Sequence, residues 1–350
     1  MDMSAYNVAL VGATGAVGAE FIQLFETRDF PLGELRLLAS TRSAGSKIAF
    51  KGTDITVQPL NHHAFEGIDF AFFCAGGARS KEFAASAVRA GAIVIDNSSA
   101  FRMGKGVPLV VPEVNPDALI NHQGIIANPN CSTILLVMIL APLMNLAPLR
   151  RVVVSTYQAA SGAGAAAMKE LEEQTAHVIA GYEPKPVVFP HPIAFNLFSH
   201  NTDIDGSGYN EEELKMLHET RKILGLDTLP LTATCIRVPI LRAHSESVNI
   251  EFDGPRPAIS DIHAALNAFP GVEVVDDRDG NIFPMPLAAS GRDEVLVGRI
   301  REDVSCGNAI DLFLSGDQIL KGAALNAYQI AETLIRMNLG RSHGKGTTDE

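Results

Sequence analysis

The sequence contains little of what a disulfide scaffold, a structural zinc site or a membrane protein requires. Its cysteines number only four, lie far apart and include no CxxC pair: Cys74, Cys131, Cys235 and Cys306. We therefore predict neither a disulfide framework nor a metal site. Long apolar runs are also missing, because the longest, Ile134 to Leu149, contains two prolines and falls short of the roughly 20 residues that a membrane span needs. That run is typical of a buried core helix, so no membrane partner is predicted.

Basic residues are in deficit. Lysine and arginine total 28 against 40 aspartates and glutamates, a formal net charge of −12, and an acidic surface argues against nucleic acid or an anionic membrane as a partner. An anionic substrate would therefore need a few basic residues gathered locally. The N-terminal stretch to Asn7 lacks the basic segment of a secretory signal, which predicts a cytoplasmic protein. The polar tail from Gly340 to Glu350 is expected to be frayed.

The length and the apolar content favour a two-domain enzyme. The chain has 350 residues, of which 47% are hydrophobic and 19% charged, the balance of a globular protein. In its first part, short apolar runs alternate with helical patterns, which predicts an α/β domain with a Rossmann-type, doubly wound parallel sheet. The runs and helical segments are Asn7 to Val11, Ala16 to Glu26, Leu35 to Ala39, Phe70 to Cys74, Arg79 to Ala90, Ile93 to Asp96 and Ile125 to Ala127.

After Cys131 the pattern changes to that of an α+β domain with a mixed or antiparallel sheet. The expected strands are Val152 to Tyr157, Thr232 to Val238, Val248 to Phe252, Val295 to Ile300 and Ile310 to Ser315, and the expected helices are Ala165 to Ile179, Glu211 to Leu224 and Ser260 to Ala268. A last helix, Gln318 to Met337, is expected to pack back on the first domain. The predicted domains are 1–130, joined by 318–340, and 131–317.

Three glycines at the join of the first strand and the first helix form a nucleotide-binding pattern. Gly12 permits the tight turn, Gly15 lets backbone N–H groups approach a pyrophosphate, and Gly18 allows the helix to pack closely on the strand. The helix N-terminus also favours negative charge. The expected contacts to a dinucleotide are Gly12, Ala13, Thr14, Gly15, Ala16 and Val17. A glycine-rich turn with only a packing role is the alternative.

The end of the second strand indicates which dinucleotide binds. An NAD enzyme usually places an acid about 20 residues after the glycines, where it holds the ribose hydroxyls. This chain instead reads Ser40-Thr41-Arg42-Ser43, with hydroxyls and a guanidinium but no acid. Those groups suit a 2′-phosphate, so we predict NADP, with Ser40, Thr41 and Arg42 as contacts. A solvated loop position is the alternative for Arg42.

Cys131 is the best candidate for a nucleophile. It follows Asn128-Pro129-Asn130 and precedes the long apolar segment, which places it at or beside a helix N-terminus. The positive end of the helix dipole favours thiolate over thiol, and the free N–H groups there could stabilise an oxyanion. The alternative, a small buried hydrophobe, fits Cys74 and Cys235 better because both lie in apolar strand patterns, and it leaves Cys306 open.

Charged residues follow several expected strands. Arg237, Arg242 and His244 come in quick succession, and an imidazole is the side chain best suited to proton transfer near neutral pH, while Arg237 could grip a carboxylate. Arg102 follows another strand end and is a candidate anion receptor. The acidic start of the helix at Glu211 suits its first turn by the dipole argument, so plain capping explains it without a function.

These segments resemble, in chain order and from about Asn7 to Met337, the aspartate-semialdehyde dehydrogenase family. The cysteine motif and the RVP…H segment together are specific, although each alone is shared with acyl-phosphate reductases generally. The matching stretches are GATGAVG (12–18), SSAFR (98–102), NPNCST (128–133), STYQAASGAG (155–164), EEELK (211–215) and IRVPILRAHS (236–245).

The resemblance implies a reversible reaction in which NADPH reduces 4-phospho-L-aspartate to L-aspartate 4-semialdehyde and phosphate is released. This step feeds the biosynthesis of lysine, diaminopimelate, methionine, threonine and isoleucine. The family's fold is a Rossmann domain with an inserted catalytic domain that dimerises, so a homodimer or tetramer is expected. No metal is implied.

The resemblance also implies a role for each matching residue. Cys131 would accept the acyl group, His244 would act as acid and base, and Gln158 would orient the substrate. Arg237 would bind the carboxylate and Glu212 the ammonium. The phosphate pocket would consist of Arg102, Lys215 and Asn130, and the contacts to the nicotinamide half of the cofactor would be Ser161, Gly162 and Gln318.

Two other functions stay open on the sequence. An N-acetyl-glutamyl-phosphate reductase runs the same chemistry, but its substrate has no free ammonium for Glu212 to meet. A catalytically silent paralogue that binds NADP as a sensor or scaffold is the other, and the intact set of Cys131, Gln158, Arg237 and His244 argues against it.

Overall fold

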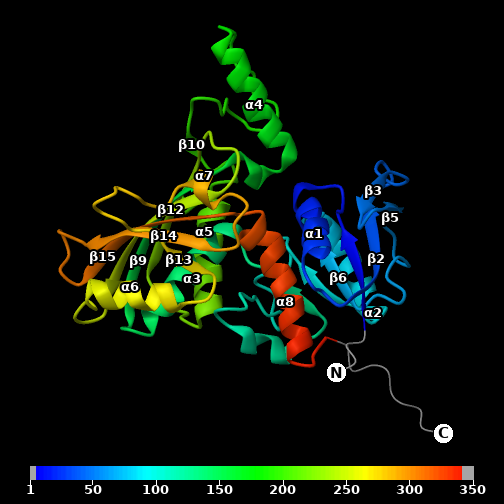
Figure 1. Cartoon of the computed structure of the whole chain (residues 1–350), viewed down its shortest axis with the longest axis horizontal. Helices are drawn as coiled ribbons and strands as arrows, with labels where there is room; N and C mark the ends of the chain where they lie inside the picture. The colour runs from blue at the N-terminus through cyan, green and yellow to red at the C-terminus, as the bar shows by residue number, and fades with distance from the viewer. Residues whose placement is uncertain (1–4, 341–350) are drawn as a thin grey trace. The chain divides into compact units, whose positions relative to one another are not determined.

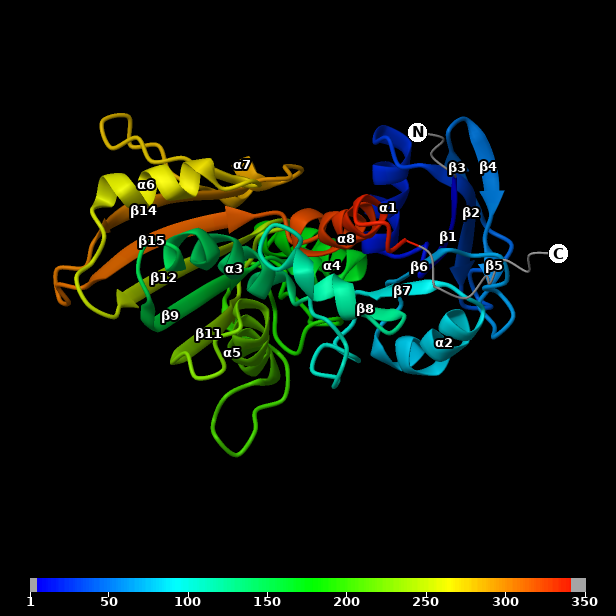
Figure 2. The same ribbon diagram turned by 90° about the horizontal axis from the view of Figure 1, so that it is seen from below.

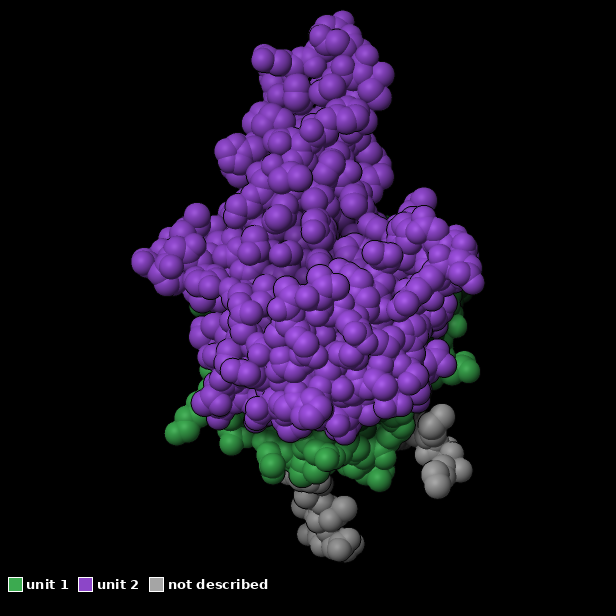
Figure 3. Space-filling model, turned by 90° about the vertical axis from the view of Figure 1, so that its left-hand side faces the viewer, with its two compact units in different colours: residues 1–129, 323–350 green, residues 130–322 purple. Residues whose placement is uncertain are grey.

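The computed structural model describes residues 5–340, and these fold into two compact units. Unit 1 comprises residues 1–129 and 323–350, and unit 2 comprises residues 130–322 (Figure 3). The first four residues and nearly all of the tail expected to be frayed lie outside the described range. Among the described helices, none combines the length and the apolar character that crossing a bilayer requires.

Unit 1 contains a six-stranded parallel sheet with the strand order β5-β2-β1-β6-β7-β8. Every residue of β6 and β7 is buried, as expected for a parallel sheet covered on both faces. Figure 2 shows α2 on one side of this sheet and α1 and α8 on the other. The doubly wound prediction is thereby confirmed. The elements are β1 (Tyr6–Val11), α1 (Ala16–Thr27), β2 (Leu32–Ala39), β5 (Gln58–Pro59), β6 (Phe70–Phe73), α2 (Gly77–Arg89), β7 (Ile93–Asp96), β8 (Ile125–Ala127) and α8 (Leu325–Arg336).

Unit 1 also contains elements that were not predicted from the sequence. A two-stranded antiparallel hairpin, β3 (Lys47–Phe50) with β4 (Thr53–Thr56), follows β2, and a 3-10 helix, Pro116–Asn121, precedes β8. Their side chains are mostly exposed, so they lack the apolar periodicity by which longer elements are recognised.

The turn between β1 and α1 is built from close backbone contacts. Gly12 has a φ of 92°, and a Cβ there would lie 2.9 Å from the carbonyl carbon of Cys74. A Cβ at Gly18 would lie 2.5 Å from the carbonyl oxygen of Gly12. The start of α1 therefore packs against the turn as closely as the glycine spacing predicts.

Unit 2 contains a seven-stranded mixed sheet with the strand order β10-β11-β9-β12-β15-β14-β13 (Figure 1). Strands β9 and β11 are parallel, and β12 runs antiparallel to both β9 and β15, which confirms the predicted mixed sheet. Helices α3, α5 and α6 pack together over it. The strands are β9 (Leu149–Gln158), β10 (Phe198–Ser199), β11 (Leu231–Arg237), β12 (His244–Phe252), β13 (Val272–Val274), β14 (Val295–Glu302) and β15 (Ala309–Gly316). The helices are α3 (Cys131–Met144), α4 (Ala165–Ile179), α5 (Glu211–Leu224), α6 (Ile259–Ala268) and α7 (Pro286–Ala289).

The central helix of unit 2 is α3, and it is apolar all round. Every residue from Ser132 to Leu143 is buried, including Pro142 in its last turn. A helix with this pattern must be surrounded by protein. The long apolar run of the sequence is therefore the core helix that was predicted.

The last helix begins later than the prediction of Gln318 to Met337. The segment Leu320–Ala324 is a π-helical turn, and the α-helix starts only at Leu325. The cause is Asp317, whose buried carboxylate accepts the backbone N–H groups of Ile319 and Leu320 and whose carbonyl accepts that of Gly322.

The chain returns to unit 1 through its last helix. Helix α8 contacts α1 and β7, and the fully buried Tyr328 ring lies 5.5 Å from the ring of Phe25 and 5.4 Å from that of Phe30. The C-terminal helix thus completes the aromatic core of unit 1.

The close packing of α1 gives a test of the fold. We expect Gly18→Ala to destabilise the protein by about 1–3 kcal/mol, because the new Cβ collides with backbone rather than with a movable side chain. Helix propensity alone predicts the opposite, a gain of about 1 kcal/mol. Thermal and urea unfolding would measure the change. The control is Gly15→Ala, whose Cβ would meet nothing closer than 3.4 Å; equal stability of the two variants would contradict the expectation.

Candidate active site

Cys131 is the first residue of α3, as the sequence predicts. The helix is capped by Asn130, whose Oδ1 accepts the N–H of Thr133 at 3.1 Å, and the backbone N–H of Asn130 donates to Glu219 at 2.6 Å. Cys131 is half-buried, and a Cβ added at Gly322 would lie 2.9 Å from the Cβ of Cys131. The thiol therefore sits at the positive end of a rigidly held helix.

The Glu212 carboxylate ties the start of α3 to the first turn of α5. The side-chain amides of Asn130 and Gln158 both donate to its Oε1, at 2.7 and 3.1 Å, and Lys215 lies 3.5 Å from its Oε2. Burial alone would raise the pKa of Glu212, but nearby His200 and Lys215 and the two amides outweigh it and lower the pKa to about 2. Glu212 is therefore a buried, ionised carboxylate.

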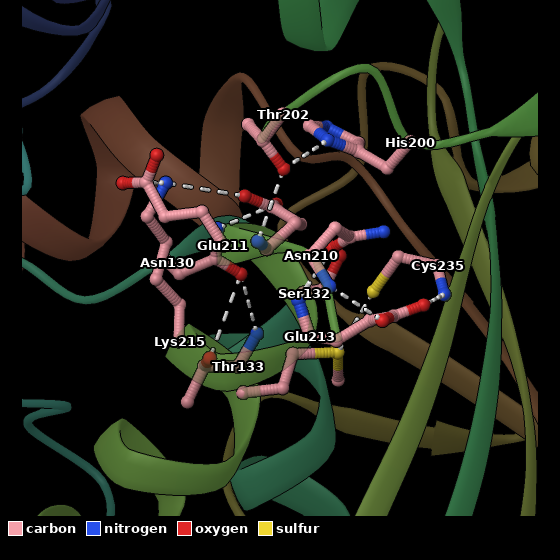
Figure 4. A network of polar contacts seen from close by, with 12 residues as sticks. Asn130, Ser132, Thr133, His200, Thr202, Asn210, Glu211, Glu213, Lys215 and Cys235 are labelled. Carbon is pink, nitrogen blue, oxygen red and sulfur yellow. Dashed lines mark hydrogen bonds and ion pairs between the residues drawn. The ribbon is translucent and has the colours of Figure 1, made fainter. Parts of the chain in front are cut away.

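The two other acids of this turn, Glu211 and Glu213, make different contacts. Glu213 forms a capping box with Asn210 and accepts the N–H of Cys235 at 3.0 Å (Figure 4). Glu211 pairs with Lys215 at 3.0 Å. Plain capping, the alternative that the sequence left open, therefore describes Glu213 but not Glu212.

Gln158 is the last residue of strand β9, and its side chain contacts Ser132, the residue after Cys131. Its Nε2 donates to the Ser132 hydroxyl at 3.0 Å as well as to Glu212. Its Oε1 is buried and has no hydrogen-bond partner among the described residues. A buried amide oxygen of this kind costs free energy unless a bound group donates to it.

Arg237 ends strand β11 and pairs with Gln158 in the strand register. Its Nη1 donates to the carbonyl of Ala159 at 2.9 Å, its Nη2 lies 2.8 Å from His200 Nε2, and its Nε has no partner in the described chain. Burial lowers the pKa of Arg237, while the charges of Glu212 and Cys131 oppose that shift. The guanidinium is fixed in place and keeps N–H groups for a ligand.

His244 is the first residue of β12, which starts four residues earlier than the strand predicted from Val248. Its Nδ1 accepts the N–H of Ala159 at 3.0 Å, and its buried Nε2 has no partner within residues 5–340. Burial, helped by Arg237, lowers the pKa of His244 to about 3. The neutral ring therefore carries its proton on Nε2.

The three residues assigned by resemblance to the nicotinamide lie together in unit 2. The Gln318 amide contacts the Ser161 hydroxyl, and its Oε1 accepts the N–H of Ala243 at 2.9 Å. A Cβ at Gly162 would lie 3.1 Å from both Arg237 Nη1 and His244 Nε2. Only a glycine leaves those two side chains undisturbed.

Six of the nine predicted nucleotide contacts in unit 1 line a cavity of about 520 Å³. Gly12, Thr14 and Gly15 form one part of the wall, and Ser40, Thr41 and Arg42 form another. Three of the predicted contacts are not in the wall, because Ala13 is buried and Ala16 and Val17 lie on α1. The full lining also includes Val11, Ala39, Ser43, Leu60, Cys74, Ala75, Arg79, Glu82 and Phe83.

Arg102, the predicted anion receptor, is buried in unit 1. Its Nε donates to the carbonyl of Asn128 at 3.0 Å, and its Nη2 donates to that of Asn97 at 2.9 Å. These contacts hold the guanidinium against the residues that directly follow β7 and β8.

The other cysteines are poor nucleophile candidates. Burial raises the pKa of Cys74 and of Cys235 far above the usual range. The Cys306 thiol lies in a loop, 3.0 Å from the Asn308 side chain. Cys131 alone among the four begins a helix.

Three neighbours of the site gave no signal in the sequence. His200 contacts Arg237, and Glu219 contacts the backbone of Asn130, but neither lies near its partner in sequence. Gly322 lies against Cys131 and belongs to a segment that the sequence predicts as helix. Such contacts depend on the fold. Only the residue types, a histidine and an acid that can pair with basic or amide groups, could have suggested them.

A glycine turn that closes a nucleotide cavity and a cysteine at a helix N-terminus are the two parts that thioester-forming dehydrogenases combine, and they define the class of this protein. Family comparison agrees with that class. A model of the semialdehyde dehydrogenase NAD-binding domain matches residues 7–122, and one of the semialdehyde dehydrogenase dimerisation domain matches residues 140–321.

Relatives define the family more narrowly. The aspartate-semialdehyde dehydrogenase of Synechocystis sp. is 54% identical over 95% of this chain and 98% of its own, and that of Bacillus subtilis is 48% identical over 95% and 98%. The chain belongs to the aspartate-semialdehyde dehydrogenase family, which confirms the resemblance stated above.

Comparison with solved structures leads to the same family. Aspartate semialdehyde dehydrogenase II of Vibrio cholerae, complexed with ASA, superposes with a TM-score of 0.92 at 41% identity, covering 95% of this chain and 98% of that one. The enzyme of Candida albicans with NADP gives a TM-score of 0.77 at 26% identity, covering 96% and 100%.

A second buried carboxyl, that of Glu246, lies two residues beyond His244 on β12. It is fully buried, and neither of its oxygens has a hydrogen-bond partner in the described chain. Burial raises the pKa of Glu246 well above its ordinary value of 4.5. The folded carboxyl therefore keeps its proton to a higher pH than an exposed one does.

Glu246 should make stability fall as the pH rises. Above pH 4.5 the unfolded carboxyl loses its proton while the folded one keeps it, so the unfolded state gains up to about 1.4 kcal/mol per pH unit until the folded pKa is reached. We expect Glu246→Gln to remove this loss and to gain on the wild type between pH 5 and 8. Urea unfolding across that range measures it, and a difference that does not change with pH would contradict the expectation.

Proposed function

We propose that the protein reduces 4-phospho-L-aspartate with NADPH to L-aspartate 4-semialdehyde and phosphate, and runs the reverse reaction, in the biosynthesis of lysine, diaminopimelate, methionine, threonine and isoleucine. One observation carries this proposal: the helix that begins with Cys131 is joined through Glu212 to Gln158. The names of the relatives support it.

The substrate's charged groups match fixed charges of unit 2. Arg237 would bind the α-carboxylate through Nε and the N–H groups not used by Ala159 and His200. Glu212, ionised and buried, would bind the ammonium. The family resemblance assigns the phosphate to Lys215, Asn130 and Arg102. These positive groups give an acidic protein the local field that an anionic substrate requires.

The chemistry would begin at Cys131. Its thiolate attacks the acyl carbon, the carbon–oxygen bond to phosphate breaks, and a thioester forms while the backbone N–H groups of α3 stabilise the oxyanion. Bound NADPH would supply the hydride that reduces this thioester. His244 would donate a hydrogen bond from its Nε2–H to the resulting tetrahedral oxygen, and that oxygen re-forms the carbonyl as the carbon–sulfur bond breaks and releases the aldehyde and the Cys131 thiolate.

The cofactor would bind mainly to unit 1. The Gly12 turn would face the pyrophosphate, Ser40, Thr41 and Arg42 the 2′-phosphate, and Ser161, Gly162 and Gln318 of unit 2 the nicotinamide half. The domains would be 1–130 with 318–340, and 131–317. A homodimer or tetramer that works in the cytoplasm completes the proposal, and the match to a dimerisation-domain model supports the dimer.

The two alternative functions differ in what they ask of Glu212 and Cys131. An N-acetyl-glutamyl-phosphate reductase would bring no substrate ammonium to the ionised Glu212, whose charge would then be met by Lys215 and not by the substrate. A silent paralogue has no use for a thiol at a helix N-terminus.

A steady-state assay separates these functions. We expect NADP reduction with aspartate semialdehyde and phosphate, much weaker turnover with NAD, and none with N-acetyl-glutamate semialdehyde. The reaction is followed at the absorbance of NADPH. Preference for the acetylated aldehyde would replace the proposal with the reductase, and a complete lack of turnover would favour the silent paralogue.

The nucleophile is tested on the same enzyme. We expect Cys131→Ser to lower kcat by at least about 10³-fold, because a hydroxyl at this position is not ionised, while Cys306→Ser stays near the wild type. Intact-protein mass spectrometry after addition of substrate should find the acyl adduct in wild type and in Cys306→Ser only. An adduct that persists in Cys131→Ser would overturn the assignment.

A further inference from the structure

The nucleotide cavity of unit 1 contains an acid that a site for a 2′-phosphate should not have. Among the described residues that line it, Glu82 is the only acid, and Arg42 and Arg79 are the only basic residues. A carboxylate beside the adenosine ribose is the device by which NAD enzymes hold the 2′-hydroxyl, and it repels a 2′-phosphate. The cavity thus holds the acid that the end of β2 lacks.

Glu82 is paired within its own helix. Both Arg79 and Glu82 lie near the start of α2, three residues apart, and Arg79 Nη1 is 2.6 Å from Glu82 Oε2. Their side chains are 53% and 45% exposed, so the pair is open to a ligand and adds little to stability. Its effect is on the charge of the cavity wall.

The rest of the lining places the adenosine half of the cofactor at this pair. Gly12 and Gly15 mark the pyrophosphate end. Leu60 and Phe83 are the larger apolar side chains of the wall, suited to an adenine ring, and Phe83 directly follows Glu82. The ribose between the two ends would therefore lie within reach of the charges of α2.

We propose that Arg79 is a specificity-determining residue, an inference that rests on the proposed use of NADP. Arg79 neutralises Glu82 and leaves Arg42 uncompensated in the cavity wall, so that the site accepts an adenosine 2′-phosphate. Without Arg79, the Glu82 carboxylate faces the ribose, repels the phosphate and favours the bare 2′-hydroxyl.

The test uses direct binding to the full chain, with adenosine 2′,5′-bisphosphate and adenosine 5′-monophosphate as probes in isothermal titration calorimetry. The variants are Arg79→Gln, Glu82→Gln and the double variant. Arg89→Gln, at the other end of the same helix and outside the cavity lining, is the matched control. Thermal unfolding of each variant verifies that α2 is intact.

We expect Arg79→Gln to weaken binding of the bisphosphate by about tenfold, the usual effect of losing one charged contact, and to leave the monophosphate unchanged or tighter. Adding Glu82→Gln should restore much of the lost affinity, since no carboxylate then remains to be neutralised. The Arg89→Gln control should match the wild type.

Two results would overturn the inference: an Arg79→Gln variant that binds the bisphosphate as well as Arg89→Gln does, or a double variant as weak as Arg79→Gln alone. Failure of the proposed cofactor choice gives a different result. In that case the wild type itself would bind the two probes equally.

Discussion

The site in unit 2 depends on one carboxylate, that of Glu212, which stays ionised inside the protein. A single oxygen of this group accepts hydrogen bonds from the cap of α3 and from the last residue of β9, while the group itself belongs to the first turn of α5. Three elements that are distant in sequence are thereby fixed together at the point where Cys131 begins its helix. Removing the whole carboxyl group would leave two buried amides without their acceptor, at a cost of about 1–3 kcal/mol for each.

The basic side chains around this carboxylate are either positively charged or neutral. Arg237 and Lys215 are positive, and His200 and His244 are neutral, because burial lowers their pKa values to about 4 and about 3. The neutral state of His200 lets its Nε2 face Arg237, and that of His244 leaves a proton on Nε2. A substrate with a carboxylate, an ammonium and a phosphate would therefore meet groups that are already charged and positioned, which lowers the cost of reorganisation during the reaction.

Much of this could be predicted from sequence because the decisive signals are local. The glycine spacing predicts the turn between β1 and α1, and an apolar run after Cys131 predicts a core helix with the cysteine at its start. Contacts between distant segments could not be predicted: nothing near His200 indicates that it meets Arg237. The late start of α8 was also missed, since the π-helical turn depends on a buried aspartate rather than on periodicity. Glu82 was passed over because the acid expected in such a site follows the second strand, whereas this one lies on α2.

The ionisation of Glu212 can be measured directly. In protein labelled with ¹³C at the glutamate carboxyls, with Glu212→Gln to assign the signal, the chemical shift of Glu212 should keep its ionised value as the pH falls through 4.5 and should change only toward a pKa of about 2. A titration midpoint at or above 4.5 would mean that the carboxylate is not stabilised by the groups around it, and it would contradict the central position given to Glu212 here.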